Sequence, residues 1–299
     1  MTDITTGHKA NAKLCFINLL LMHTAIEKKG YDSRLIAYPS IIAVVFIALT
    51  STVGIFSNDF YRRESVNWQL QSGGQDIINL LLVLPLLLMS VVSVHLNKRL
   101  SMLIWAGTML YCFYTFTIYC FDVHFNNLFL LYCAILCISI YTLIYFLHFY
   151  LDRWVPEKAL SHYPFSWTGI YFLLISISFG VLWLMDIIPA VTGGSFPETL
   201  SQINLPTNPV HVLDLSFILP GIFLTGISLL GKHRIGYLLA PVFLVFFMLM
   251  DVTIAILAMI MKTQGQGGSF MLAGGMIVLA IISLGFFISG LKALPYEKK

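Results

Sequence analysis

Charged side chains are scarce in this sequence. Asp, Glu, Lys and Arg make up 10% of its 299 residues, against roughly a quarter in an ordinary soluble domain. Hydrophobic residues reach 58%, and so few charges could not cover a water-exposed surface of this size. The 17 Lys and Arg are offset by 14 Asp and Glu, so the net charge is only +3 and a nucleic-acid partner is excluded. The composition is that of an integral membrane protein.

Familiar catalytic and redox motifs are also missing. The sequence has no CxxC, and four of its five cysteines fall in apolar segments, where they are expected to be small buried residues. It has no HExxH and no GxSxG, and the glycine pairs at 73–74, 193–194 and 267–268 lie in predicted turns rather than between a strand and a helix. We therefore predict no resident cofactor, although bound protons or cations remain compatible with the acidic residues.

Eight apolar segments are long enough to cross a membrane as helices, which requires about 20 residues. The sequence thus predicts an all-α integral membrane protein with a membrane domain over 35–291 and a short tail over 292–299. The predicted spans are Leu35–Phe56, Asp76–Leu96, Ser101–Phe121, Asn127–Leu151, Trp167–Ala190, His211–Gly231, Gly236–Met261 and Ser269–Leu291.

The N-terminal segment that precedes the first span differs from the rest. Its apolar stretch over 14–22 is too short to span a membrane, and charged residues follow it where a signal peptide would have a small-residue cleavage site. Apolar residues recur at helical spacing at Leu14, Ile17, Leu21 and Ala25. Segment 1–34 is therefore predicted to be a cytoplasmic segment with a helix lying at the membrane interface.

The distribution of positive charge predicts the orientation of the chain. With eight spans, both termini lie on one side, and that side carries fourteen of the Lys and Arg residues. The other side carries only Arg62, Arg63 and Lys262. Because positively charged loops stay in the cytoplasm, we predict cytoplasmic termini and integration into a cytoplasmic or plasma membrane.

Two parts of the sequence resemble each other. When the sequence is shifted along itself so that Pro85 falls on Pro220, the second and third spans align with the sixth and seventh without a gap. In this alignment VLPLLLMSVVS (83–93) is paired with ILPGIFLTGIS (218–228). A proline inside a helix removes a backbone hydrogen bond and bends the helix. Both prolines are therefore predicted either to act as hinges or simply to shape the bundle.

The first and fifth spans also align, at a slightly different offset that pairs Gly54 with Gly180. Together these matches predict a parallel 4+4 duplication with repeats over 35–151 and 163–291, an arrangement found in transporters. The alternative is that apolar hairpins resemble one another in composition alone.

The acidic residues of the spans, together with His124 and His211, gather in the half of the membrane opposite the termini. The alignment that pairs the two prolines also places Asp76 and Asn79 on His211 and Asp214, and each pair lies on one face of its helix. These faces are predicted to converge on one polar cavity that opens outward. The candidate residues for binding a solute or ion are Asp76, Asn79, Tyr111, Tyr114, His124, Asp186, His211, Asp214 and Asp251.

Structural roles compete with binding for these residues. Asp76 and Asp214 fall in the predicted first turns of their helices, where a carboxylate would cap free N–H groups. Asp251 is far from both ends of its predicted span, so it either has a function or forms a structural hydrogen bond. A metal site at His124, His211 and Asp214 is a weaker alternative, because the spacing HVLD is no metal signature.

Three functions fit these features. The first is a transporter that couples a small solute to protons or cations through the outward-facing cavity. The second is a membrane-embedded enzyme that acts on a lipid or isoprenoid at the outer leaflet through His and Asp residues. The third is a sensor or assembly subunit without turnover. We expect the first, with the lipid bilayer and a small solute or ion as partners.

Overall fold

The structure is a computed structural model that describes residues 32–57, 59–94, 99–154, 165–197, 200 and 205–293. Within these ranges it contains helices and turns and no β-strand. Eight helical segments are long and apolar enough to cross a membrane, which indicates an integral membrane protein. The elements are α2 (Arg34–Phe56), α3 (Val66–Ile78), η1 (Asn79–Val83), α4 (Leu84–Val94), α5 (Arg99–Phe121), α6 (Phe129–Trp154), α7 (Phe165–Gly193), α9 (Pro209–Leu213), η3 (Asp214–Ile218), α10 (Leu219–Leu230), α11 (Arg234–Thr263) and α12 (Phe270–Ala293).

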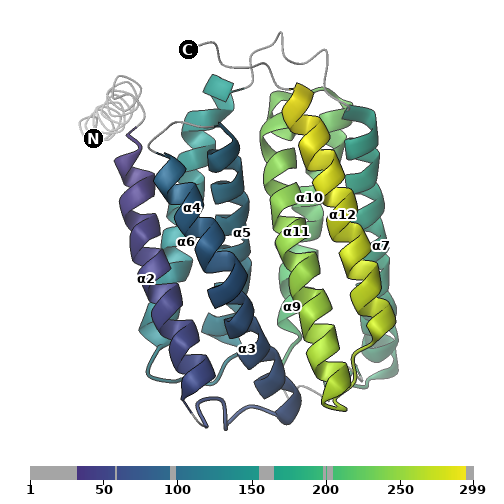
Figure 1. Cartoon of the computed structure of the whole chain (residues 1–299). Coiled ribbons are helices and arrows are strands. Elements are labelled where there is room, and N and C mark those ends of the chain that lie inside the picture. Colours follow the sequence, from purple (N-terminus) through teal and green to yellow (C-terminus); the bar gives the residue numbers. More distant parts are fainter. Residues whose placement is uncertain are drawn as a thin grey trace, which may run out of the picture.

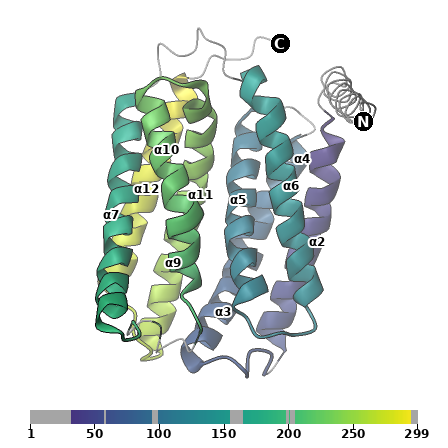
Figure 2. The same ribbon diagram turned by 180° about the vertical axis from the view of Figure 1, so that it is seen from behind.

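The helices form two groups of four that stand side by side (Figures 1 and 2). The first group contains α2, the continuous segment α3–η1–α4, α5 and α6. The second group contains α7, the continuous segment α9–η3–α10, α11 and α12. The start of α2 and the end of α12 lie at the same end of the molecule, which we call the terminal end (Figure 1). The opposite end is the distal end.

Contacts between α5 and α11 join the two groups. At Gly107 of α5 a methyl group would lie 2.4 Å from Cβ of Val245 and 2.8 Å from the carbonyl oxygen of Val242, so only glycine permits this approach. Further contacts link α11 with α3 and α5 with α9. Each of these two further contacts joins a central helix of one group, α5 or α11, to the broken helix of the other group.

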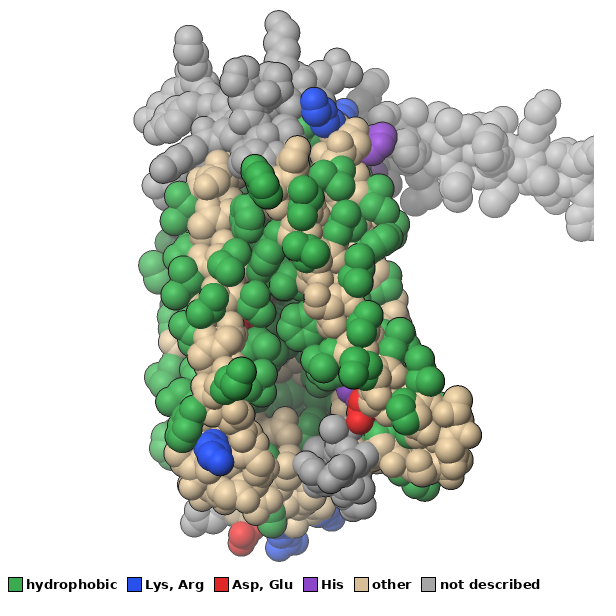
Figure 3. Space-filling view, turned by 90° about the vertical axis from the view of Figure 1, so that its right-hand side faces the viewer, with side chains coloured by type: hydrophobic (Ala, Val, Ile, Leu, Met, Phe, Trp, Pro, Cys, Tyr) green, Lys and Arg blue, Asp and Glu red, His purple; other side chains and the backbone are tan. Residues whose placement is uncertain are grey.

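The flank that carries α7 and α12 is covered by hydrophobic side chains, whereas Lys and Arg lie near its two ends (Figure 3). Large apolar side chains such as Leu174, Met185 and Met271 are 60%, 70% and 89% exposed. Soluble monomers rarely present an apolar surface of this extent, but lipid tails would cover it favourably.

Two of the eight segments contain a π-helical turn at corresponding positions. η1 begins at Asn79 and η3 begins at Asp214, and these are the two residues that the sequence alignment pairs. Pro85 and Pro220 are each the second residue of the α-helix that follows. In a regular helix the proline ring collides with the carbonyl group four residues earlier, and the wider π turn relieves this clash. A hinge role for either proline stays a prediction.

The second predicted span begins ten residues too late. In the structure α3 begins at Val66, and the Ser65 hydroxyl accepts a hydrogen bond from the Trp68 amide. Its first turns, VNWQLQSGGQ, contain too many polar residues and glycines for hydropathy to reveal them. Asp76 therefore lies well inside the helix, and the alternative that it caps the helix is wrong.

The capping alternative for Asp214 is also wrong. The sixth span begins at Pro209, and its capping residue is Asn208, whose side chain accepts from the amides of Val210 and His211. Asp214 follows more than one turn later, where the backbone is already helical. Its carboxylate is thus available to other partners. The predicted interfacial helix falls almost entirely on residues 1–31, outside the described residues.

Candidate functional site

A chain of hydrogen bonds joins the two groups of helices near the middle of α5. Gln75 of α3 donates from Nε2 to the Tyr111 hydroxyl at 2.7 Å and to Oδ1 of Asn79 at 3.0 Å. The Tyr111 hydroxyl lies 2.8 Å from Oγ1 of Thr253 on α11. Because Thr253 donates its own proton to the Leu249 carbonyl, Tyr111 is the donor between these two hydroxyls. The chain therefore runs from α3 through α5 to α11.

Asn79, the first residue of η1, is almost completely buried. Its Oδ1 accepts from Gln75, but its amide nitrogen has no hydrogen-bond partner among the described residues. A buried N–H group without a partner is costly, typically by about 1–3 kcal/mol. The structure thus holds an unused donor beside the interface between the two groups.

One turn along α5 from Tyr111, a second tyrosine binds the carboxylate that begins η3. The Tyr114 hydroxyl donates to Oδ1 of Asp214 at 3.1 Å, and Nε1 of Trp183 donates to Oδ2 at 2.9 Å. The ring centroids of Trp183 and His211 are 4.6 Å apart, and Asp186 interacts electrostatically with His211. Asp214 therefore takes donors from both groups of helices.

Asp76 belongs to a separate cluster inside the first group. It is completely buried, and its two carboxylate oxygens accept from the hydroxyls of Tyr61 at 2.6 Å and Tyr119 at 2.9 Å. The Tyr132 ring packs edge to face on that of Tyr119. A methyl group on Gly54 of α2 would overlap this carboxylate, so the glycine provides the space that Asp76 occupies.

His124 lies in the distal turn between α5 and α6 and is bound by Glu64. Its backbone amide donates to Oε1 of Glu64 at 2.8 Å, and its Nδ1 lies 2.9 Å from Oε2. The Glu64 side chain is 3% exposed and the His124 side chain is 50% exposed. This pair fastens two distal loops of the first group to each other.

Asp251 lies apart from all of these groups. It is 7% exposed, and its carboxylate receives no hydrogen bond or ion pair from any residue in the part of the chain that the structure describes. Tyr171 of α7 interacts with it electrostatically, and the Tyr171 hydroxyl is hydrogen-bonded to Ser283 of α12 at 2.9 Å. Asp251 thus faces the interior of the second group, away from Thr253 and α5.

The predicted residues therefore fall into several groups. Those at the interface on α5 form one, which contains Asn79, Tyr111, Tyr114, Asp186, His211 and Asp214. Asp76, His124 and Asp251 each have different neighbours. A single cavity that joins all nine stays a prediction.

The alternative metal site is not assembled. Among the described residues, no three or more His, Cys, Asp or Glu side chains gather closely enough to hold a metal ion. His124 is occupied by Glu64, whereas His211 and Asp214 lie beside Trp183. His124 belongs to a distal loop of the first group, so these ligand types share a side of the membrane but not a site.

Sequence reasoning missed several residues that complete the clusters. Gln75 is one of them. It lies four residues before the predicted residue Asn79 on the same helical segment, and this spacing was a usable signal for their contact. Trp183 and Thr253 reach their partners only through the packing of distant helices. Tyr61 reaches Asp76 from the loop that precedes α3. No local sequence pattern marks these three residues. Cys120 and Cys133 also approach each other, with 3.9 Å between their sulfur atoms, although no spacing motif relates them.

Two distal groups outside the spans have shifted acidities. Burial, and then the Asp76 carboxylate, hold the pKa of the Tyr61 hydroxyl far above its usual range. Tyr61 is therefore a permanent proton donor to Asp76. Burial also raises the pKa of Asp122, directly after α5, to about 6.

No family model, no curated protein and no solved structure matches the chain.

Proposed function

We propose that this protein is an integral membrane transporter that couples the movement of a small solute to protons or cations. The observation that carries the proposal is the polar network between the two groups of helices. It contains Tyr111 and Tyr114 on α5, Thr253 on α11, and the first residues of both π-helical turns, Asn79 and Asp214. Transporters place their binding sites near the middle of the membrane, between repeats and on interrupted helices.

The position of this network along the helices supports transport. Tyr111 is twelve residues after the start of α5 and ten before its end, which puts it near the middle of the span. Polar side chains at such a depth are costly in a membrane and usually serve a solute or ion pathway. The carboxylate of Asp214 offers a site for a proton or cation, and the unused amide of Asn79 offers a donor to a solute.

A parallel 4+4 duplication is part of the proposal. Three features support it: the two groups of four helices, the π-helical turns that begin at aligned residues, and the equivalent contacts α3 with α11 and α9 with α5. If the first group were superposed on the second, the contact of α3 with α11 would fall on the contact of α9 with α5. In an experimental structure, we expect the first half of the chain to superpose on the second half, with Pro85 on Pro220 and Asn79 on Asp214. Halves in which these pairs face different directions would contradict it.

We further propose that the distal end faces away from the cytoplasm, because the loops of the terminal end carry most of the Lys and Arg. A reporter that is active only in the cytoplasm, fused after Lys299, should be active. An inactive reporter on a correctly expressed fusion would reverse the orientation.

Transport can be tested in proteoliposomes that enclose a pH-sensitive dye. A panel of small amines, amino acids, sugars and carboxylates is added outside, with and without a sodium gradient. At least one solute is expected to change the internal pH or to accumulate in an ion-dependent way. Asp214→Asn should abolish this effect, because it removes the charge and keeps the shape, whereas the loop variant Asp122→Asn should retain it. Equal flux in liposomes with wild type and Asp214→Asn would refute the proposal.

A further inference from the structure

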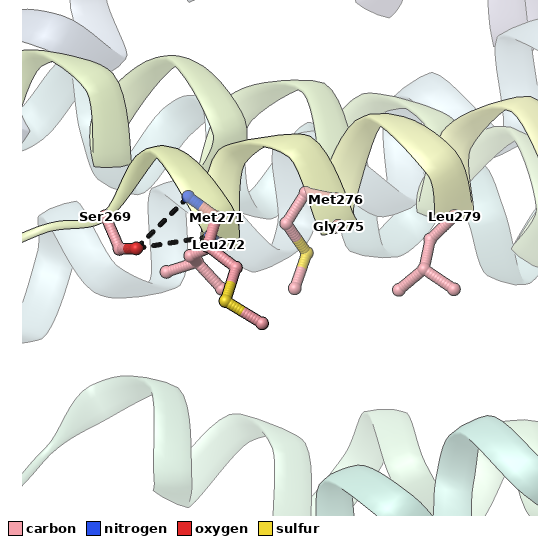
Figure 4. Close-up of a pocket in the computed structure, with 6 residues that line it drawn as sticks. All are labelled: Ser269, Met271, Leu272, Gly275, Met276 and Leu279. Atoms are coloured by element: carbon pink, nitrogen blue, oxygen red, sulfur yellow. Dashed lines mark hydrogen bonds between the residues drawn. The ribbon is translucent and has the colours of Figure 1, made fainter.

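An apolar groove runs along the distal half of α12. It has a volume of about 600 Å³ and is lined by Ser269, Met271, Leu272, Gly275, Met276 and Leu279. The side chains of Met271, Leu272, Met276 and Leu279 point from α12 toward the same space (Figure 4). The same flank is hollowed in its distal half, with acidic and histidine atoms at the edge of the hollow (Figure 3).

The helices α7 and α11 pack against α12 beside the groove. Met276 of α12 packs with Ala255 and Ala258 of α11, and Phe179 of α7 packs against this cluster. Ala255 and Ala258 lie four and seven residues after Asp251, so all three share one face of α11. Asp251 is therefore one helical turn beyond the cluster, toward the terminal end.

Contacts of α12 also connect the groove with the surroundings of Asp251. Ser283 follows Leu279 by one turn, and it is hydrogen-bonded to Tyr171, which interacts electrostatically with Asp251. The inner end of the groove thus approaches a carboxylate that is buried and has no hydrogen bond or ion pair from a described side chain. A buried carboxylate without such a partner attracts a cation or a hydrogen-bond donor.

We propose that this groove binds an amphiphilic amine, with the ammonium head at Asp251 and the alkyl chain along α12. The lined part of α12, from Ser269 to Leu279, extends about 15 Å along the helix axis at 1.5 Å per residue, which suits a medium-length alkyl chain. Its lining residues are apolar apart from Ser269, so an alkyl chain lies against them without loss of hydrogen bonds. The proposal concerns binding alone and holds whether or not the protein transports a solute.

Photochemical labelling in lipid nanodiscs tests this proposal. The probe is dodecylamine with a diazirine at the end of its chain, and the comparison probe is dodecanol with the same group. Labelled peptides are identified by mass spectrometry. The amine should label the segment from Met271 to Leu279 at least about tenfold more than the alcohol, because a charge-assisted contact contributes about 1.5–3 kcal/mol. Equal labelling by both probes would mean an ordinary lipid-chain groove and would overturn the proposal.

Variants of the protein test the proposed site of the ammonium head and that of the alkyl chain separately. Asp251→Asn should reduce labelling by the amine to the level of the alcohol. Gly275→Phe should abolish labelling by both probes, since a side chain at Gly275 meets nothing within 4 Å and would fill the groove. Gly274→Phe is the matched control, because Gly274 is equally open but does not line the groove. An amine preference that persists in Asp251→Asn, or labelling that persists in Gly275→Phe, would refute the site.

Discussion

The most buried carboxylates of the two groups of helices differ in their hydrogen-bond partners. In the first group Asp76 has a donor on each oxygen, and a glycine on the neighbouring helix provides the space for it. In the second group Asp251 is almost as buried, but no described side chain donates to it. A buried polar group with satisfied hydrogen bonds stabilises a unique packing. One without partners costs stability and is retained for what it binds.

This difference separates structure from function within one fold. The cluster around Asp76 fixes α2, α3 and α5 relative to one another, and Tyr61 extends it to the distal loop. In the second group Asp214 accepts from Tyr114 of α5, at the border with the first group, whereas Asp251 lies inside the group near Tyr171. We therefore expect the first group to serve as the scaffold and the second group to carry the exchangeable ligands.

The largest expected effect comes from a pair of glycines that the sequence alignment matches. Gly54→Ala would place a methyl group within the Asp76 carboxylate and should lower the free energy of unfolding by about 3 kcal/mol or more. Gly180→Ala meets only Leu219 Cδ1, at 4.0 Å, and should be neutral or slightly stabilising. Thermal unfolding of both variants in detergent measures the difference. Similar melting temperatures would remove the distinction between the two groups.

A smaller effect is expected at the contact between the groups. Gly107→Ala would force α5 away from Val245, with an expected loss of about 1–3 kcal/mol and a reduced solute flux. Gly73→Ala is the control, because a methyl group there meets no atom within 4 Å. Unchanged flux and stability in Gly107→Ala would show that the two groups do not depend on this close approach.

The hydrogen-bond chain between the groups should contribute less. Tyr111→Phe removes the hydroxyl that links Gln75 to Thr253, and hydrogen bonds of this kind in membrane proteins contribute about 0.5–1.5 kcal/mol. Tyr141→Phe on the exposed surface of α6 should change nothing. A double-mutant cycle of Tyr111→Phe with Thr253→Val isolates the contact, and a coupling energy near zero would argue against it.

The smallest effect concerns pH. The pKa of Asp122 is raised to about 6 by burial, so the folded protein keeps this proton over a range in which the unfolded chain has lost it. Stability should therefore fall as pH rises from about 4 to 6 and then level off. Asp122→Asn should remove this contribution. Melting curves of wild type and variant that keep the same difference at every pH would contradict the assignment.

The sequence predicts the helices much better than it predicts their contacts. The eight apolar runs determine the spans, because burial in lipid depends on composition over a whole segment. Hydropathy did not predict the helix over residues 66–75, because this polar start of α3 is stabilised by packing against the second group and not by contact with lipid. Pro85 and Pro220 predicted an irregularity in each helix, but not the π-helical turns that precede them.

The candidate site could be predicted only in its residue types. Carboxylates and tyrosines inside apolar spans are unusual enough to stand out, which is why Asp76, Asp214 and Asp251 were candidates. Their roles depend on whether a partner approaches from another helix, as Tyr119 does for Asp76 and Trp183 does for Asp214. Such contacts follow from the packing of the whole bundle.

The most direct test of this account compares two isosteric variants in the same lipid nanodiscs, by melting temperature and by photochemical labelling with the dodecylamine and dodecanol probes. Asp76→Asn replaces one acceptor by an amide donor that faces a tyrosine hydroxyl, and it should lower the melting temperature by several degrees, as expected for about 1–3 kcal/mol. Asp251→Asn should leave the melting temperature unchanged or slightly raised and should reduce labelling by the amine probe to the level of the alcohol probe. Undiminished amine preference in Asp251→Asn, or unfolding of that variant while Asp76→Asn stays stable, would contradict the central claim.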